Sequence, residues 1–235
     1  MKFKVLTLFP EMFPGPLNHS LVGKALKKKI FEVSPINIRD FSDNKSKTVD
    51  DKPFGGGAGM IMKPDVLQSS LDFVNQVKSK SRRIFCFSPS GKKVNQKLFK
   101  SLLKYDEIIL ICGRYEGFDQ RFLDYNKIEQ LSLGDYIISG GELGAFILID
   151  ACVRLIPEVL GNSKSLCSES FDNHLLEYAQ YTKPYEWKNV KVPDVLLSGN
   201  HKKISDWRLQ NSLEKTKKIR PDLYKLFMEE KKRKL

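Results

Sequence analysis

The sequence predicts an α/β protein built on a mostly parallel sheet, followed by a small C-terminal helical domain. Up to Pro157, short apolar runs alternate with segments of helical periodicity, which is typical of βαβ units. With 235 residues, 41% of them hydrophobic, the chain is long enough to bury a sizeable core. Beyond Pro157 the sequence becomes polar and then basic, which indicates a second domain with another role.

The predicted strands and helices follow one another in a regular order. The first strand, at 3–9, ends at Pro10 and lacks a small-residue cleavage site, so it is not read as a signal peptide. Apolar residues at helical spacing, such as Val66, Leu67 and Leu71, predict a helix at 65–77. Further strands are predicted at 33–41, 83–87, 107–112 and 128–131, and further helices at 21–30, 96–103, 119–123 and 142–155.

The segment after Pro157 sets the predicted domain boundaries. Residues 161–185 are polar without a clear period, and a structureless loop of that length is uncommon inside one domain. We therefore expect a catalytic domain at 1–160, a linker at 161–180 and a helical domain at 181–235. Ser198-Gly199-Asn200 is a helix-start signal, and Pro221 is expected to break the basic helical pattern that follows.

The net charge of +12 is concentrated near the C-terminal end. Residues 201–235 hold 12 Lys and Arg against five Asp and Glu. A cationic surface of this kind favours a polyanion such as a nucleic acid, because released counterions drive the association. The alternative interpretation is a solvated helix face.

Cysteine spacing and hydropathy indicate a cytoplasmic protein. No run of 18 apolar residues is present, so no transmembrane helix is expected. The four cysteines show no CxxC spacing, which predicts reduced thiols and no cysteine-based metal site. The histidines are scattered without metal-ligand spacing, so the residues themselves predict no metal site: His19, His174 and His201.

Two glycine-rich loops, 112–117 and 133–143, predict a pocket for a small ligand. The first directly follows the apolar run 108–111, and ligands of open α/β sheets gather at the carboxyl ends of strands. We expect the second loop to be tight and buried, offering backbone groups to the ligand. Alternatively, the glycines only make turns. A nicotinamide-binding Rossmann domain would need GxGxxG after the first strand, where Phe9-Pro10-Glu11-Met12-Phe13 stands instead.

A third loop, 50–60, is a candidate RNA contact. Gly55-Gly56-Gly57 could nest a phosphate beside Lys52. The loop lacks the GK[ST] ending of a P-loop, so nucleotide hydrolysis is not expected. A flexible surface linker is the other interpretation.

Five runs in order along the chain resemble one family: 8–13, 48–60, 112–117, 133–143 and 195–201. They are similar to the bacterial tRNA (guanine-N1)-methyltransferases of the TrmD family. The resemblance implies a SPOUT-type catalytic domain with a deep trefoil knot that binds S-adenosylmethionine. It also implies a homodimer that methylates N1 of the guanosine at tRNA position 37, and a Mg²⁺ requirement.

The resemblance also assigns binding residues. Arg114, Tyr115 and Glu116 would line the donor and guanine pocket, and Asp50, Gly59 and Arg114 would contact the substrate. The expected donor-binding residues are Pro89, Gly113, Tyr115, Glu116, Leu133, Gly134, Asp135, Tyr136, Ile137, Ile138, Gly140 and Gly141.

Methylation at guanine N1 asks for a general base and for a cation near O6. Arg154 fits the cation, although an Asp150–Arg154 surface pair is the common fate of that spacing. The family places an aspartate base within a Glu-Asp-Ser-Phe-like motif. Here Ser168-Glu169-Ser170-Phe171 stands at that position, so Glu169 would be the base, acting on the partner subunit's site. Because Glu169 stands where the family has aspartate, the alternative of a non-catalytic RNA-binding protein with the same scaffold stays open.

Overall fold

The computed structural model describes residues 1–77, 79–160 and 169–233. The chain falls into two compact units, Met1–Gly161 and Asn162–Leu235. Within the described residues, no helix combines the length and the apolar character needed to span a bilayer.

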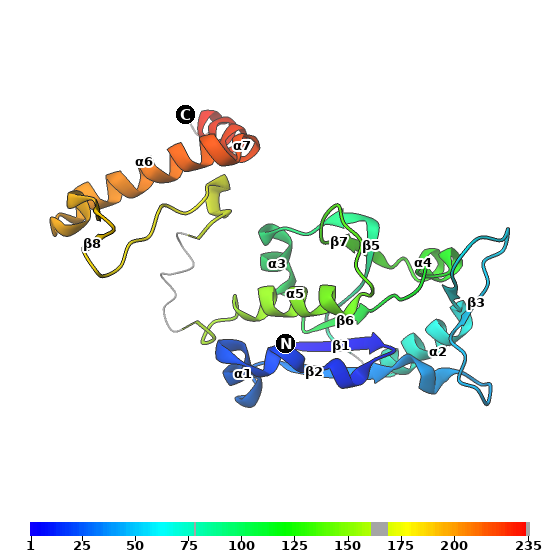
Figure 1. The fold of residues 1–235 in the computed structure, drawn as a ribbon. Coiled ribbons are helices and arrows are strands. Elements are labelled where there is room, and N and C mark those ends of the chain that lie inside the picture. The colour runs from blue at the N-terminus through cyan, green and yellow to red at the C-terminus, as the bar shows by residue number, and fades with distance from the viewer. Residues whose placement is uncertain (78, 161–168, 234–235) are drawn as a thin grey trace. The chain divides into compact units, whose positions relative to one another are not determined.

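The first unit is built on a five-stranded sheet in the order β2-β1-β6-β5-β7, with every neighbouring pair parallel. The strands are β1 (Lys2–Thr7), β2 (Glu32–Asn37), β5 (Arg82–Lys93), β6 (Glu107–Ile111) and β7 (Glu129–Ser132). The helices that alternate with them are α1 (Ser20–Lys27), α2 (Pro64–Asn75), α3 (Gln96–Leu102), α4 (Gln120–Tyr125) and α5 (Glu142–Val153), as Figure 1 shows. The predicted α/β architecture with a mostly parallel sheet is confirmed.

The core lies on both faces of the sheet. β6 is central and buried along its whole length, as expected of a parallel strand covered on both sides. One face contributes Leu6, Ile109 and Ile111 to a cluster that α2 completes with Leu67 and Leu71. Side chains alternate along a strand, so their buried neighbours Val5, Ile108 and Leu110 face the other side.

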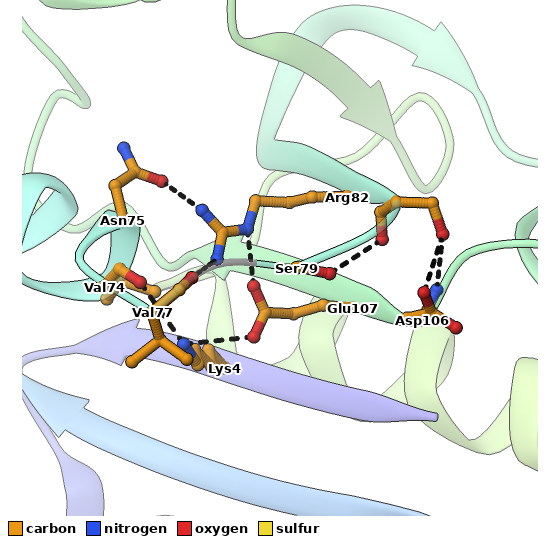
Figure 2. Close-up of polar contacts among 9 residues, drawn as sticks. Lys4, Val74, Asn75, Val77, Ser79, Arg82, Asp106 and Glu107 are labelled. Carbon is orange, nitrogen blue, oxygen red and sulfur yellow. Dashed lines mark hydrogen bonds and ion pairs between the residues drawn. The ribbon is translucent and has the colours of Figure 1, made fainter.

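A buried carboxylate closes the amino edge of the sheet. Glu107 begins β6 with its side chain 4% exposed, and it pairs with Lys4 Nζ at 3.0 Å and Arg82 Nε at 2.5 Å. Figure 2 shows both cations also reaching the C-terminal end of α2. Lys4 donates to the Val74 carbonyl at 3.3 Å, and Arg82 donates to the Val77 carbonyl at 2.6 Å. Lys4 thus satisfies a carbonyl in the last turn of α2, and Arg82 satisfies one just beyond the end of the helix.

Two predicted strand boundaries were wrong. The strand predicted at 33–41 ends at Asn37, whose side chain accepts a hydrogen bond from the Arg39 backbone and starts the 3-10 helix η3 (Ile38–Phe41). The strand predicted at 83–87 continues to Lys93 as β5, with a shift of its register against β7 between Phe87 and Lys92. Ser88 and Pro89 interrupt the apolar pattern there, so the sequence pattern did not predict that the strand continues.

The remaining elements of the first unit are short. They are the 3-10 helices η1 (Pro10–Met12) and η2 (Gly15–Asn18) and the antiparallel pair β3 (Asp50–Asp51) and β4 (Ile61–Met62). The glycine-rich residues 55–59 join these two strands.

The second unit contains two long helices, α6 (His201–Ile219) and α7 (Pro221–Arg233), which contact each other. Asn200 starts α6 by accepting a hydrogen bond from the Lys203 backbone at 3.1 Å, and Pro221 begins α7, both as the sequence predicted. Ahead of them lie η5 (Asp172–His174), the hairpin β8 (Glu186–Trp187) and β9 (Val190–Lys191), and η6 (Asp194–Leu197).

Candidate functional site

A cavity of about 380 Å³ lies at the carboxyl edge of the sheet. Its walls come from β5 and from the loops that follow β6 and β7, three strands that are neighbours in the sheet. This is the place where open α/β sheets bind ligands, and the volume suits a small organic molecule. The lining segments are Phe87–Ser90, Gly113–Phe118, Gln130–Gly134 and Tyr136–Gly141, with Gln120 and Leu123.

The glycines of the two predicted loops permit close packing of backbone. The Gly141 backbone N–H donates to the Gly113 carbonyl at 2.9 Å, so the loops touch. A Cβ at Gly141 would lie 2.8 Å from Cys112 Cα, and one at Gly113 would lie 2.7 Å from Phe118 Cζ. These glycines therefore serve a close approach of chain segments as well as turning the chain.

The loop 133–141 differs from its prediction in one respect. It was expected to be buried, yet Asp135, Tyr136, Ile137 and Ser139 are exposed, with Ile137 at 80%. Its first residues, Leu133 and Gly134, are half-buried, and only its last residues, Gly140 and Gly141, are buried. The middle of the loop forms one wall of an open pocket, which explains why apolar residues there face solvent.

A buried ion pair underlies the pocket. Glu142, the first residue of α5, is 1% exposed and pairs with Arg114 Nη2 at 3.0 Å. The Thr7 hydroxyl donates to the other carboxylate oxygen at 2.7 Å. The Arg114 guanidinium stacks on the Phe9 ring at 4.4 Å and donates to the Ser139 carbonyl at 3.2 Å. Among the described residues, the buried Nε of Arg114 has no hydrogen-bond acceptor.

The pocket collects nearly all of the predicted donor-binding residues. Asp135 is the exception: it is absent from the lining, and its carboxylate accepts from Lys93 Nζ at 2.6 Å. Sequence reasoning missed Ser88, Ser90 and Gln130 on the β5 and β7 side. The run Ser88-Pro89-Ser90-Gly91, with four small residues after an apolar strand, was the signal that could have found them.

The predicted substrate loop joins the rim of this pocket. The Glu116 backbone N–H donates to the Met60 carbonyl at 2.9 Å, and a Cβ at Gly59 would lie 2.4 Å from Glu116 Oε1. Gly59 and Glu116 are therefore in contact, as a shared site would require. Asp50 lies farther along on β3, paired with Met62, and does not line the cavity.

The two predicted catalytic residues stand in different units. Arg154 directly follows α5 in the first unit and is half-buried. Glu169 belongs to the second unit and is also half-buried, whereas Ser168 lies outside the described residues. Within residues 1–77, 79–160 and 169–233, no cluster of three or more His, Cys, Asp or Glu side chains suits a metal ion.

The thiol of Cys112, which precedes the pocket residue Gly113, is held in its neutral form. Burial raises the pKa of Cys112 well above its usual range, with a smaller contribution from the Glu142 carboxylate. A thiol held neutral in this way is a poor nucleophile, because the thiolate is the reactive form. Cys112 therefore acts as a small packing residue beneath Gly141.

The parallel sheet and the pocket at its carboxyl edge define an α/β protein with a cavity at the place where open α/β sheets bind small ligands. The model of the family described as tRNA (Guanine-1)-methyltransferase TrmD matches residues 1–226, and the chain belongs to that family. The tRNA (guanine-N(1)-)-methyltransferase of Ehrlichia canis (strain Jake) is 52% identical over 224 residues, 95% of each chain.

Two further relatives give the same result. The tRNA (guanine-N(1)-)-methyltransferase of Pelagibacter ubique (strain HTCC1062) is 52% identical over 95% of this chain and 97% of its own. The enzyme of the same name from Anaplasma marginale (strain Florida) is 49% identical over 96% of this chain and 95% of its own. The similarity thus spans both units.

Proposed function

We propose that this chain is an S-adenosylmethionine-dependent tRNA (guanine-N1)-methyltransferase that acts in the cytoplasm on the guanosine at tRNA position 37. The observation that carries the proposal is the pocket between Gly113 and the loop 133–141, in a chain that belongs to the TrmD family. A methyltransferase of this family implies S-adenosylmethionine as the methyl donor. The relatives' names specify N1 of guanine in tRNA as the acceptor.

The pocket's chemistry fits such a donor. Leu133 and Ile138 supply apolar surface, while Gly113, Gly134 and Gly140 bring backbone polar groups close to a ligand. We place the trefoil knot of the family here as well. Its support is the close passage of the start of α5 against another segment, with Gly141 bonded to Gly113 and packed on Cys112.

The reaction transfers a methyl group from the donor sulfonium to guanine N1 and releases S-adenosylhomocysteine. N1 bears a proton at neutral pH, so a base must accept that proton as the N–C bond forms. We assign the base to the Glu169 carboxylate and the stabilisation of negative charge on O6 to the Arg154 guanidinium. We assign contact with the guanine to Arg114, and the support is its position in the pocket lining, where it pairs with Glu142.

A homodimer would bring Glu169 to the pocket of the partner subunit. Support comes from α5, whose exposed stripe carries Leu143 at 48% and Ile147 at 46% exposure in a helix that is otherwise apolar and buried. Asp150 and Arg154 continue this stripe at helical spacing. A second copy covering the stripe would shield the apolar residues and set Arg154 at the edge of the interface.

The basic second unit would bind the tRNA. We assign donor binding to residues 1–160, connection to 161–180 and tRNA binding to 181–235, where Lys217, Lys218 and Lys225 lie on the helices. Among the described residues, no group of three or more His, Cys, Asp or Glu side chains could hold the Mg²⁺ that the family resemblance implies. The assay is therefore run with and without it.

The direct test uses unmodified tRNA transcripts and S-adenosylmethionine, with the product located by mass spectrometry. We expect methyl transfer to transcripts with guanosine at position 37 and none to transcripts with adenosine there. Binding of tRNA without methyl transfer would support the non-catalytic alternative instead. Calorimetry with S-adenosylhomocysteine and with NAD tests the pocket separately, and only the former should bind.

The base is tested by Glu169→Gln, which keeps the size of the side chain and removes its proton acceptor. Single-turnover methyl transfer should fall by about 10²-fold or more, with tRNA affinity nearly unchanged. Glu169→Asp is the second variant. It keeps the carboxylate but shortens the side chain to the family's aspartate, so it tests whether the longer side chain is needed. A wild-type rate for Glu169→Gln would place the base elsewhere.

The shared site is tested by mixing subunits. A chain with Arg154→Ala and a chain with Glu169→Ala are each expected to be inactive as homodimers. Heterodimers of the two should regain about one working site, because one pocket receives both intact residues. Verified heterodimers without any recovery would contradict action across the interface.

A further inference from the structure

Three side chains of α6 fasten an extended segment of the second unit. Asn211 Oδ1 accepts from the Ala179 backbone at 2.7 Å, and Thr216 Oγ1 accepts from the Leu176 backbone at 2.8 Å. Lys215 Nζ donates to the Glu177 carbonyl at 2.9 Å. Thr216 is fully buried and also donates to the Ser212 carbonyl at 2.6 Å. We call these three residues, Asn211, Lys215 and Thr216, the α6 clamp.

The clamped segment closes the turn that begins beside Glu169. Ser170 Oγ accepts from the Glu177 backbone at 3.0 Å, and the Phe171 backbone donates to the Leu175 carbonyl at 2.7 Å. His174 on η5 reaches Glu230 of α7 at 3.6 Å. The residue after Glu169 is therefore bonded to a residue that α6 itself holds.

The backbone of this turn is unusual. Phe171, Asn173 and His174 have φ values of 74°, 49° and 61°, a region that side chains other than glycine rarely enter. Such conformations cost free energy and persist only where the surrounding structure determines them, and they gather at functional sites. The α6 clamp and the hydrogen bonds within the turn are the contacts that hold this backbone conformation.

We infer that Asn211, Lys215 and Thr216 are positioning residues for methyl transfer, because they hold the turn that directly follows Glu169 on the helix that carries the basic surface. The inference rests on the proposed function, in which Glu169 is the base. The helices that bind the tRNA then also position the general base, Glu169, relative to the target nucleotide. In this arrangement the clamp acts on the rate of methyl transfer and leaves affinity for tRNA and donor unchanged.

The test removes single clamp bonds and measures rate and affinity separately. Thr216→Val keeps the side-chain shape and removes the hydroxyl, and Asn211→Ala removes the second acceptor. Each variant should lower the single-turnover rate at saturating donor and tRNA by about tenfold or more, with tRNA and donor dissociation constants within about twofold of wild type. Thr216→Ser should restore the rate because it keeps the hydroxyl.

Gln210→Ala is the matched control, since Gln210 neighbours Asn211 on α6 but its side chain bonds to Glu214 of the same helix and not to the clamped segment. It should keep the wild-type rate. If Thr216→Val also weakens tRNA binding, the substitution has damaged the helix. The Asn211→Ala and Lys215→Met variants, at half-buried positions, then decide whether the clamp affects the rate. Wild-type rates in those variants would overturn the inference.

A double-mutant cycle separates positioning of Glu169 from other effects. If the clamp acts through Glu169, adding Thr216→Val to Glu169→Gln should slow the reaction no further. Multiplied losses would overturn the inference and leave the base assignment standing. A wild-type rate for Glu169→Gln alone would instead refute the base, and the clamp's role with it.

Discussion

Thr7 and Glu142, 135 positions apart in the sequence, share a hydrogen bond of 2.7 Å beneath the pocket. The bond ties the last residue of β1 to the first residue of α5, and Arg114 adds the loop after β6 to the same carboxylate. Thr7 Oγ1 also accepts from the Phe9 backbone at 3.0 Å. One buried carboxylate thus joins the end of β1 to the start of α5 and to the loop after β6, whose Arg114 lines the pocket.

Replacing Thr7 by valine should destabilise the first unit. The change keeps the shape of the side chain but removes the donor to a buried carboxylate, which costs roughly 1–3 kcal/mol. Urea unfolding measures the loss, and calorimetry should show weaker donor binding because the loop after β6 is less well held. Thr7→Ser keeps the hydroxyl and should lose much less. Equal stability of the valine variant and wild type would contradict this role.

Gly140→Ala should disable the pocket at a position where the chain crowds a buried charge. A Cβ there would lie 2.3 Å from Arg114 Nε and 2.6 Å from Glu142 Oε2, so the guanidinium must move. We expect donor affinity to fall by about tenfold or more, which corresponds to at least ~1.4 kcal/mol. The neighbouring Ser139→Ala changes an exposed side chain and should bind donor nearly as wild type does. A similar loss in both variants would argue against the steric explanation.

Glu107→Gln should lower stability without slowing methyl transfer by the folded enzyme. It leaves Lys4 and Arg82, whose side chains are only 15% and 18% exposed, without their carboxylate. Breaking a buried ion pair on one side costs roughly 3–5 kcal/mol. Urea unfolding should show the loss, while the rate per folded molecule stays near wild type because Glu107 lies at the opposite edge of the sheet from the pocket. A catalytic defect would show coupling across the sheet.

Stability should fall in alkaline solution through the buried thiols. Burial raises the pKa of Cys86 and of Cys152 from 9.0 to about 12. Between these values the unfolded thiol has lost its proton and the folded thiol has kept it, so the free energy of unfolding falls as pH rises, by ~1.4 kcal/mol per pH unit for each thiol. Cys152→Ala should flatten the pH dependence measured by urea unfolding at pH 9.5–10.5 by that amount. Parallel curves for wild type and variant would refute it.

The basic face of α6 should bind tRNA phosphates through Lys217 and Lys218, which are exposed. Replacing both by methionine should weaken tRNA binding and reduce the salt slope by about one for each phosphate that a lysine no longer neutralises, without affecting donor binding. Lys215 is excluded from this set, because its ammonium group already bonds the Glu177 carbonyl. An unchanged salt slope would indicate that these lysines belong to a solvated helix face and do not contact tRNA phosphates.

Much of the architecture could be predicted because the chain shows it locally. The apolar run at 108–111 and the alternation with helices predicted a parallel sheet, and Asn200 and Pro221 marked helix starts through their own side-chain and backbone chemistry. The continuation of β5 past Phe87 could not be seen, because small and polar residues there follow no strand pattern. Its pairing with β7 is decided by a neighbour distant in sequence.

The candidate site was also predicted only in part from the sequence. Glycine loops after apolar runs identified the pocket, since their positions follow from the polarity of parallel strands. Glu142 and Thr7 gave no signal, because a buried carboxylate at a helix start looks in sequence like an ordinary helix-favouring acid. The burial of 133–141 was overestimated, because composition does not tell which side of a loop faces a cavity.

The tightly packed glycines in the pocket wall have a consequence for inhibitors of the proposed donor site. At Gly113, Gly140 and Gly141 any added side chain would collide with neighbours within 3 Å, so these positions cannot readily mutate to exclude a competing drug. Resistance would have to arise from side chains at the open rim, such as Tyr136 or Ile137, which are 55% and 80% exposed. Compounds that rely on the inner backbone wall and avoid that rim would leave few mutations that confer resistance.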